Sequence, residues 1–306
     1  MRKISKKRAA TAERKASRPG RPALRSFAFE TVTLDPEGRE TERRRGRAQQ
    51  FAERLGSRAI LQMVQIPPGT FTMGAPADEA GSSDAERPQR VVTVPPFCLG
   101  RFPVTIAQWR AVMGAAPPAM QTLTKAFMAS GRQPVVRVSC DDAEAFCREL
   151  SRRTRRDFRL PSEAEWEYAC RAGTVTPFAF GAAITREVVH HDGEMRRLLG
   201  ETPATIPVGS LGVANGFGLF DMHGNVWEWC RDSWHADYRG APLDGSAWRS
   251  DERTRVLRGG SWYSDAKLCR SASRALGRET DSVRSRAIGF RVAMTAPSVL
   301  VAPRNR

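Results

Sequence analysis

The chain has 306 residues, of which 41% are hydrophobic and 27% are charged, and its mean hydropathy is −0.45. These values are typical of a globular protein surrounded by water. No run of about 18 apolar residues occurs, which excludes a transmembrane helix. The N-terminus is charged and lacks the apolar segment of a signal peptide. We therefore expect a cytoplasmic protein that does not bind membranes.

The net charge of +16 is concentrated at the N-terminus. Residues 1–25 hold ten basic side chains and one acidic side chain, Glu13, whereas residues 26–57 are neutral overall. Because the first segment has little to bury, we expect a disordered basic tail at 1–25. Clustered Lys and Arg can bind nucleic acid weakly and nonspecifically by releasing counterions. The alternative is a solvated tail without a partner, since no aromatic side chain lies among the basic ones to stack on bases.

The next segment, residues 26–59, is interpreted as a connector. Apolar residues at its start indicate a short extended piece, and the charged run at 40–45 indicates a helix. A folded domain is then expected at 60–294, followed by a C-terminal tail at 295–306.

Strand signals mark the start of this domain. Residues 63–74 predict a hairpin, because Pro68-Gly69 is a turn dipeptide and Phe71 alternates with Met73 after it. Residues 90–94 predict a further strand.

Two helices are expected in the middle of the chain. Asp141 with Glu144, and Ser162 with Glu165, have the spacing of a helix capping box, and apolar residues follow on one face. Beyond Gly173, regular periodicity is lost and Gly, Trp and turn residues accumulate. Long ordered loops are therefore expected in the second half.

The six cysteines give no metal or disulfide signature. No Cys-x-x-Cys pair occurs among them, and their spacings match no zinc template. We expect them to be reduced and mostly structural.

A series of short motifs then points to a known family. In chain order, they are Phe71-Thr72-Met73-Gly74, Pro103-Val104-Thr105, Arg159–Glu167, Pro207–Ser210, Asn215–Met222, His223–Trp229, Arg255–Trp262 and Gly289–Val292. Together they resemble the formylglycine-generating enzyme, or sulfatase-modifying factor, family, over roughly residues 60–293. The resemblance implies an α+β, C-type-lectin-like fold with small antiparallel sheets, two helices and long ordered loops.

The resemblance also bears on copper chemistry. The family's enzymes oxidise a sulfatase cysteine to formylglycine with copper held by two thiolates. The resemblance places the second thiolate at Cys269 and puts Ser264 at the position of the first. A serine hydroxyl does not replace a thiolate on Cu(I), which prefers soft sulfur ligands. Copper binding is therefore not expected, and Cys269 is a catalytic candidate without its partner.

Three functions stay open at this point. The leading hypothesis is a ligand- or partner-binding module that takes a protein or peptide. One alternative is an oxidoreductase of the family that acts on proteins or peptides. The other is a lectin-like binding protein diversified by a retroelement, with residues 262–288 as its recognition surface.

The resemblance places the family's substrate groove in the segment after the Gly-Gly-Ser-Trp motif. Aromatic anchors beside Arg and Asp are typical of binding surfaces. The candidate binding residues are Trp262, Tyr263, Ser264, Asp265, Lys267, Arg270, Ser273 and Arg274. The alternative is an ordinary solvated loop.

A calcium site is also implied by the resemblance. Its ligands would be the side chains of Asp221 and Glu228 and the backbone carbonyls of Gly224 and Val226. Two carboxylates in a turning loop can supply the oxygen ligands that Ca²⁺ requires. The alternative is that Asp221 caps a turn and Glu228 pairs with an arginine.

Overall fold

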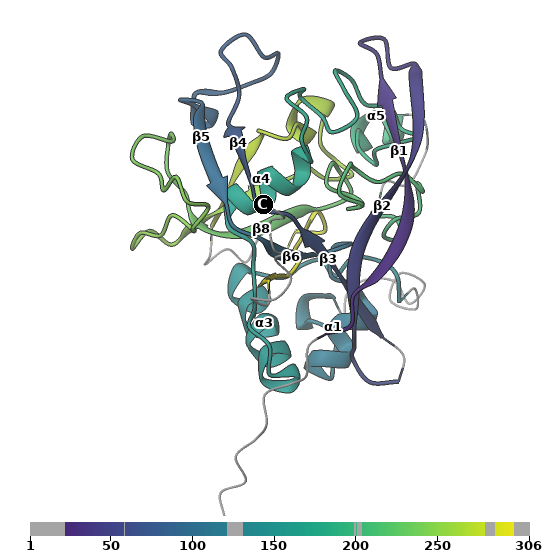
Figure 1. Ribbon diagram of the computed structural model, residues 1–306. Coiled ribbons are helices and arrows are strands. Elements are labelled where there is room, and N and C mark those ends of the chain that lie inside the picture. The colour runs from purple at the N-terminus through teal and green to yellow at the C-terminus, as the bar shows by residue number, and fades with distance from the viewer. Residues whose placement is uncertain are drawn as a thin grey trace, which may run out of the picture.

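The computed structural model describes residues 22–57, 59–120, 131–198, 200, 204–278 and 285–296. In this part, the chain forms an α+β fold with three sheets and short helices packed against them (Figure 1). Most of the predicted tails at 1–25 and 295–306 lies outside the described residues. Within them, no helix is long and apolar enough to cross a membrane.

The largest sheet has six strands, and every neighbouring pair in it is antiparallel. Across the sheet, the strands are β1 (Arg25–Leu34), β2 (Glu40–Arg54), β3 (Ile60–Ile66), β6 (Phe97–Gly100), β12 (Ala293–Thr295) and β7 (Phe158–Arg159). The C-terminal strand β12 therefore lies between two strands from earlier parts of the chain.

Strands β1 and β2 form a long hairpin at the edge of this sheet, at the right of Figure 1. The helix predicted at 40–45 is wrong, because these residues pair with β1 as a strand. The hairpin is also part of the sheet rather than a connector to it. Strand β2 pairs with β3, and Phe29, Val32 and Phe51 are buried. The charged side chains at 40–45 are exposed. The run of charges therefore indicates exposure to solvent and does not indicate a helix.

Two smaller sheets complete the β structure. One contains β10 (Arg274–Arg278), β9 (Thr254–Arg258), β8 (Trp227–Ser233) and β11 (Ile288–Gly289), and the other contains β4 (Gly69–Met73) and β5 (Arg90–Val94). The strand predicted at 90–94 is confirmed as β5. The hairpin predicted at 63–74 is wrong, because β4 pairs with β5 while β3 pairs with β2 and β6.

The helices are short, and α1, α3 and α4 carry side-chain caps at their N-termini. They are α1 (Ile106–Met113), α3 (Cys140–Thr154), α4 (Glu163–Arg171) and α5 (Gly193–Leu198), with 3-10 turns at Asp84–Glu86, Pro118–Met120 and Ala266–Cys269. The capping box of Ser162 and Glu165 is confirmed at the start of α4. Helix α3 is instead capped by Ser139 with Asp142, two residues before the predicted box. The described part therefore has more helices than the two expected.

A buried charge cluster joins α4 to the smaller sheets. Glu167 is fully buried and accepts hydrogen bonds from Arg171 Nε and the Gly74 amide, both at 2.9 Å, and from Arg258 Nη2. Arg274 forms a second buried pair with Glu163, with Nε 2.6 Å from Oε1. These pairs hold β9, β10 and the end of β4 against one helix, which positions the loops that follow β9.

Candidate functional site

The candidate site begins in the turn that follows β9. Gly259 and Gly260 have φ angles of +98° and +72°, a region that glycine adopts readily. A Cβ atom on Gly260 would lie 2.4 Å from the Cys269 sulfur, so only glycine lets this thiol pack against the turn. The Gly-Gly sequence therefore seats Cys269 beneath the loop at 261–269.

The structure brings Ser264 and Cys269 to the same backbone group. The amide N–H of Ser261 donates to Ser264 Oγ at 3.0 Å, and it is near enough to the Cys269 thiol to favour the ionised form of that thiol slightly, against the effect of burial on its pKa. The Ser261 and Ser264 hydroxyls are 3.1 Å apart, so the Ser264 oxygen lies within a neutral hydrogen-bond pair. The two side chains thus lie close together, as a metal-binding pair would require, but only one carries sulfur.

The Cys269 sulfur is fully buried. Burial raises the pKa of this thiol far above its ordinary value, so it is protonated at neutral pH. A thiol that is both buried and protonated is neither nucleophilic nor a ready metal ligand.

A buried histidine lies behind Cys269. His223 Nδ1 is 2.6 Å from the Cys269 carbonyl oxygen, and its Nε2 accepts a hydrogen bond from the Ala179 amide at 3.1 Å. The Cys170 sulfur is 3.6 Å from the same Nε2. Burial lowers the pKa of His223 to about 4, so the ring is neutral. His223 therefore fastens two loops together and does not act as a charged base.

The predicted calcium ligands lie next to this turn. The Gly224 amide donates to the Gly259 carbonyl at 2.7 Å, and the Trp262 amide donates to the Asn225 carbonyl at 3.0 Å. Asp221 and Asn225 have positive φ angles of 55° and 61°, which curl the backbone from Asp221 to Val226. Backbone hydrogen bonds therefore join the predicted calcium loop to the turn that carries Ser264 and Cys269.

Glu228 is held by two donors and is fully buried. Arg291 binds it through Nε to Oε2 at 2.6 Å and Nη2 to Oε1 at 2.7 Å, and Trp166 Nε1 donates to Oε2 at 2.7 Å. Glu228 therefore has an arginine partner, as expected in the alternative to a calcium site. Oε2 accepts two hydrogen bonds and Oε1 accepts one, which leaves a lone pair on Oε1.

Asp221 is different, because among the described residues its carboxylate has one hydrogen-bond donor, the Gly209 amide at 2.8 Å. Arg291 bonds the backbone carbonyl of Asp221 and not its carboxylate. Burial raises the pKa of Asp221 to about 6, and the nearby Glu228 charge adds to the rise. Arg291 and Arg132 lie near enough to counter part of this rise, but neither donates a hydrogen bond to the carboxylate among the described contacts. A partly buried carboxylate with one amide donor fits a site that a hard cation would complete.

Few side chains in the described ranges are available to bind a metal ion. No group of three or more His, Cys, Asp or Glu side chains in the described ranges could hold a metal ion. A calcium ion at Asp221 would therefore depend on Glu228 Oε1 and on the Gly224 and Val226 carbonyls for its other protein ligands.

Comparison with known proteins settles the family. Residues 49–296 match the model of the sulfatase-modifying factor enzyme 1-like domain. The chain belongs to this family.

Two curated relatives and one solved structure illustrate the range of the family. A formylglycine-generating enzyme of Thermomonospora curvata is 31% identical, in an alignment that covers 58% of this chain and 73% of the relative. The inactive C-alpha-formylglycine-generating enzyme 2 of Bos taurus is 30% identical, in an alignment that covers 60% of this chain and 74% of the relative. The structure of PvdO from Pseudomonas aeruginosa matches with a TM-score of 0.68 and 32% identity, over 80% of this chain and 98% of that one. The predicted α+β, C-type-lectin-like fold of the sulfatase-modifying factor family is confirmed.

Part of the predicted binding segment is exposed. Tyr263 has 48% of its surface exposed, Asp265 and Lys267 are exposed, and Trp262 is half-buried. Trp262 Nε1 donates to the Arg286 carbonyl at 3.1 Å, and its ring lies edge-on to Tyr263 with centroids 5.4 Å apart. We call Trp262, Tyr263, Asp265 and Lys267 the aromatic face.

The other predicted binding residues are buried, so their assignment to a binding surface is corrected. Arg270 is 2% exposed and pairs with Glu86 at 2.8 Å and with Glu79. Arg274 is paired with Glu163, as described above. Ser264 and Ser273 are also buried. Arg270 Nε also donates to the Lys267 carbonyl at 2.9 Å and so anchors one end of the aromatic face. The four buried side chains are not available to a ligand.

Sequence reasoning missed the role of Arg291. This residue is fully buried, and besides Glu228 it bonds the carbonyls of Gly100, Phe220 and Asp221. The signal was an arginine between apolar residues in the Gly-Phe-Arg-Val motif, since a buried guanidinium requires acceptors. The distant partner Glu228 could not be identified from spacing.

Proposed function

We propose that this protein is a non-oxidative member of the sulfatase-modifying factor family that binds a protein or peptide through the aromatic face. The observation that carries the proposal is the presence of Ser264 near Cys269. Copper chemistry would need a thiolate at both positions, and Ser264 supplies a hydroxyl.

The argument against copper chemistry concerns both members of the pair. A Ser264 hydroxyl does not ionise near neutral pH and is a hard ligand, whereas Cu(I) selects soft sulfur. The Cys269 thiol would have to lose its proton while fully buried, against a raised pKa. A relative named as an enzyme and a relative named as inactive are about equally similar to this chain. Overall sequence identity therefore does not distinguish an active from an inactive protein, and the argument rests on Ser264 and Cys269.

The argument for binding rests on the support beneath the aromatic face. The Trp262 amide and indole are both hydrogen-bonded, and the Tyr263 amide donates to Ser261 Oγ at 3.3 Å. Buried ion pairs at Arg270 hold the following turn against Glu86. Exposed Trp and Tyr side chains on a rigid loop lose little entropy on binding and are the usual energetic centres of protein interfaces. Lys267 and Asp265 would supply the polar rim.

Selection of peptides from a displayed library tests the binding role. We expect peptides that bind the wild-type protein and lose at least tenfold in affinity to Trp262→Ala. Leu243→Ala is the matched control, because Leu243 is 61% exposed and lies outside the aromatic face. If selected peptides bound both variants equally, or if no peptide were enriched, the proposed surface would be wrong.

We further propose that calcium binds at Asp221 as a structural ion. Asp221 supplies a partly buried carboxylate whose only described donor is one amide, and the Asp221–Val226 backbone curls beside it. When bound, the ion would supply positive charge that offsets the buried Asp221 and Glu228 carboxylates. The ion would then fix the loop that carries Asn225. It would also fix Trp262, whose amide donates a hydrogen bond to the Asn225 carbonyl.

A further inference from the structure

A pocket lies between the β1–β2 hairpin and the loop at 172–181, away from the aromatic face. Its volume is about 640 Å³, which is in the range of small-molecule sites. His223 separates the two regions, because its Nε2 faces Ala179 in the pocket wall while its Nδ1 faces the Cys269 carbonyl. Strand β1 and residues 40–48 precede the matched family region, so one wall comes from outside it. We call this space the hairpin pocket.

Two glycines shape the pocket, one where the walls meet and one within the hairpin. A Cβ atom on Gly181 would lie 2.3 Å from the Leu34 carbonyl oxygen, so a side chain there would push the loop away from β1. The Leu34 amide instead donates to the Phe180 carbonyl at 2.6 Å and closes one end. On the other wall, a Cβ atom on Gly46 would lie 2.4 Å from the Phe29 ring, so the glycine leaves room for this ring.

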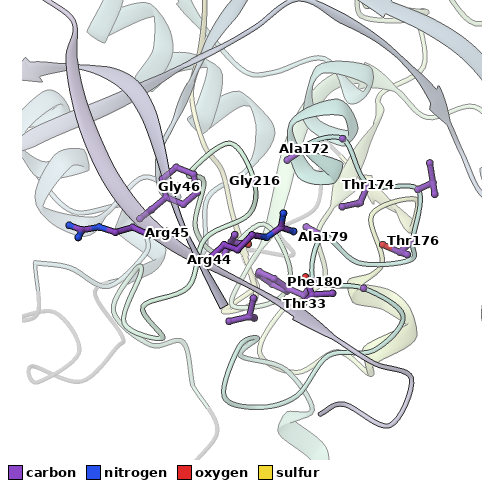
Figure 2. Close-up of a pocket in the computed structure, with 16 residues that line it drawn as sticks. Thr33, Arg44, Arg45, Gly46, Ala172, Thr174, Thr176, Ala179, Phe180 and Gly216 are labelled. Carbon is purple, nitrogen blue, oxygen red and sulfur yellow. The ribbon is translucent and has the colours of Figure 1, made fainter. Parts of the chain in front are cut away.

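The charge of the lining is one-sided. It contains Arg44 and Arg45 and no acidic residue. In Figure 2, the Arg44 side chain extends across the pocket toward Ala179, whereas Arg45 points to the opposite side of the hairpin. Arg44 Nε is paired with Glu42 at 3.0 Å, but the two side chains are 64% and 50% exposed. Such an exposed pair contributes little free energy, so an anion in the pocket can bind the same guanidinium at little cost.

The remaining lining is apolar or hydroxyl-bearing. Phe29, Val32 and Phe180 line the pocket with the edges of otherwise buried side chains, and threonines lie around them. The Thr174 and Thr176 hydroxyls donate to the Arg171 and Phe178 carbonyls, at 3.0 and 2.7 Å, so their oxygens present acceptor lone pairs. A purely ionic ligand would leave this apolar surface unused.

We propose that the hairpin pocket binds a small organic anion, whose acidic group pairs with Arg44 and whose apolar body covers the ring edges of Phe29 and Phe180 that line the pocket. Guanidinium groups bind carboxylate, phosphate and sulfate oxygens through paired hydrogen bonds. The apolar body accounts for affinity beyond that of the acidic group alone.

Titration of the full chain with phenyl phosphate tests this proposal, with inorganic phosphate and phenol as partial probes. Calorimetry should give tighter binding for phenyl phosphate than for either probe, and amide NMR shifts should concentrate in residues 172–181. Arg44→Gln should weaken phenyl phosphate binding about tenfold, or about 1.4 kcal/mol. Arg47→Gln is the matched control, because Arg47 is an exposed arginine of the same strand outside the lining.

Three results would overturn the proposal. Equal affinity for phosphate and phenyl phosphate would remove the apolar contact. Equal losses in Arg44→Gln and Arg47→Gln would reduce the interaction to general charge attraction. Shifts that avoid residues 172–181 would place any binding elsewhere on the protein.

Discussion

Replacement of Asp221 with asparagine separates an ion-stabilised loop from a loop that is stable without an ion. Without calcium, burial raises the pKa of this carboxyl from 3.8 to about 6. At 1.36 kcal/mol per pKa unit, keeping Asp221 ionised in the fold costs about 3 kcal/mol. Because the pKa is raised in the folded state, stability should fall as pH rises from about 4 to about 6 and stay low above that.

The assay is urea unfolding at pH 8 in EDTA and in excess calcium. In EDTA, Asp221→Asn should be more stable than the wild type by up to about 3 kcal/mol, because the buried charge is gone. Calcium at about 100 times its dissociation constant should raise wild-type stability by about 2.7 kcal/mol. It should leave the variant unchanged, because the variant lacks the principal ligand.

Glu228→Gln removes the second carboxylate of the site. In EDTA it should lose about 3–5 kcal/mol, because Arg291 would keep a buried charge without its carboxylate. Its response to calcium should also be smaller than that of the wild type, because Glu228 Oε1 is one of the proposed ligands. Superimposable wild-type unfolding curves in EDTA and calcium would refute the calcium site.

Three further predictions test the fold and the tail. Glu167→Gln should lower the free energy of unfolding by about 3–5 kcal/mol in urea, because Arg258 loses a fully buried partner. All six cysteines are buried and free, so a thiol reagent should modify them only after denaturation; fast modification of the native protein would contradict their burial. Deletion of residues 1–21, which carry nine basic side chains and precede β1, should abolish salt-sensitive DNA binding without changing the melting temperature; equal binding by both forms would place the contact on the folded domain.

Local signals in the sequence predicted local structure well. The cap of α4 follows from Ser162 and Glu165, which interact across a single turn. For α3, the same spacing occurs twice, and the box at Ser139 forms instead of the one at Asp141 because the helix begins at Cys140. A short-range pattern therefore establishes that a helix exists more reliably than where it starts.

Features that depend on distant partners were not predicted. The run at 40–45 is a strand because β1 pairs with it, and β3 leaves the expected hairpin because β2 and β6 flank it. Arg270 and Arg274 are residue types that are common in binding surfaces. In the fold they are buried and form ion pairs with Glu86 and Glu163, which are far away in the sequence. The position of Ser264 beside Cys269 was implied by family motifs, whereas the protonated state of the thiol required the fold.

Anaerobic titration with Cu(I), in competition with a chromophoric chelator, tests the loss of the copper pair most directly. The wild-type protein should show no tight one-to-one site, because Ser264 supplies no thiolate and Cys269 is buried and protonated. Ser264→Cys should gain one equivalent of tightly bound Cu(I), because a second thiol would complete the soft ligand pair and so offset the cost of deprotonating Cys269. A tight wild-type site that disappears in Cys269→Ala, with oxygen-dependent conversion of a cysteine peptide, would contradict the account.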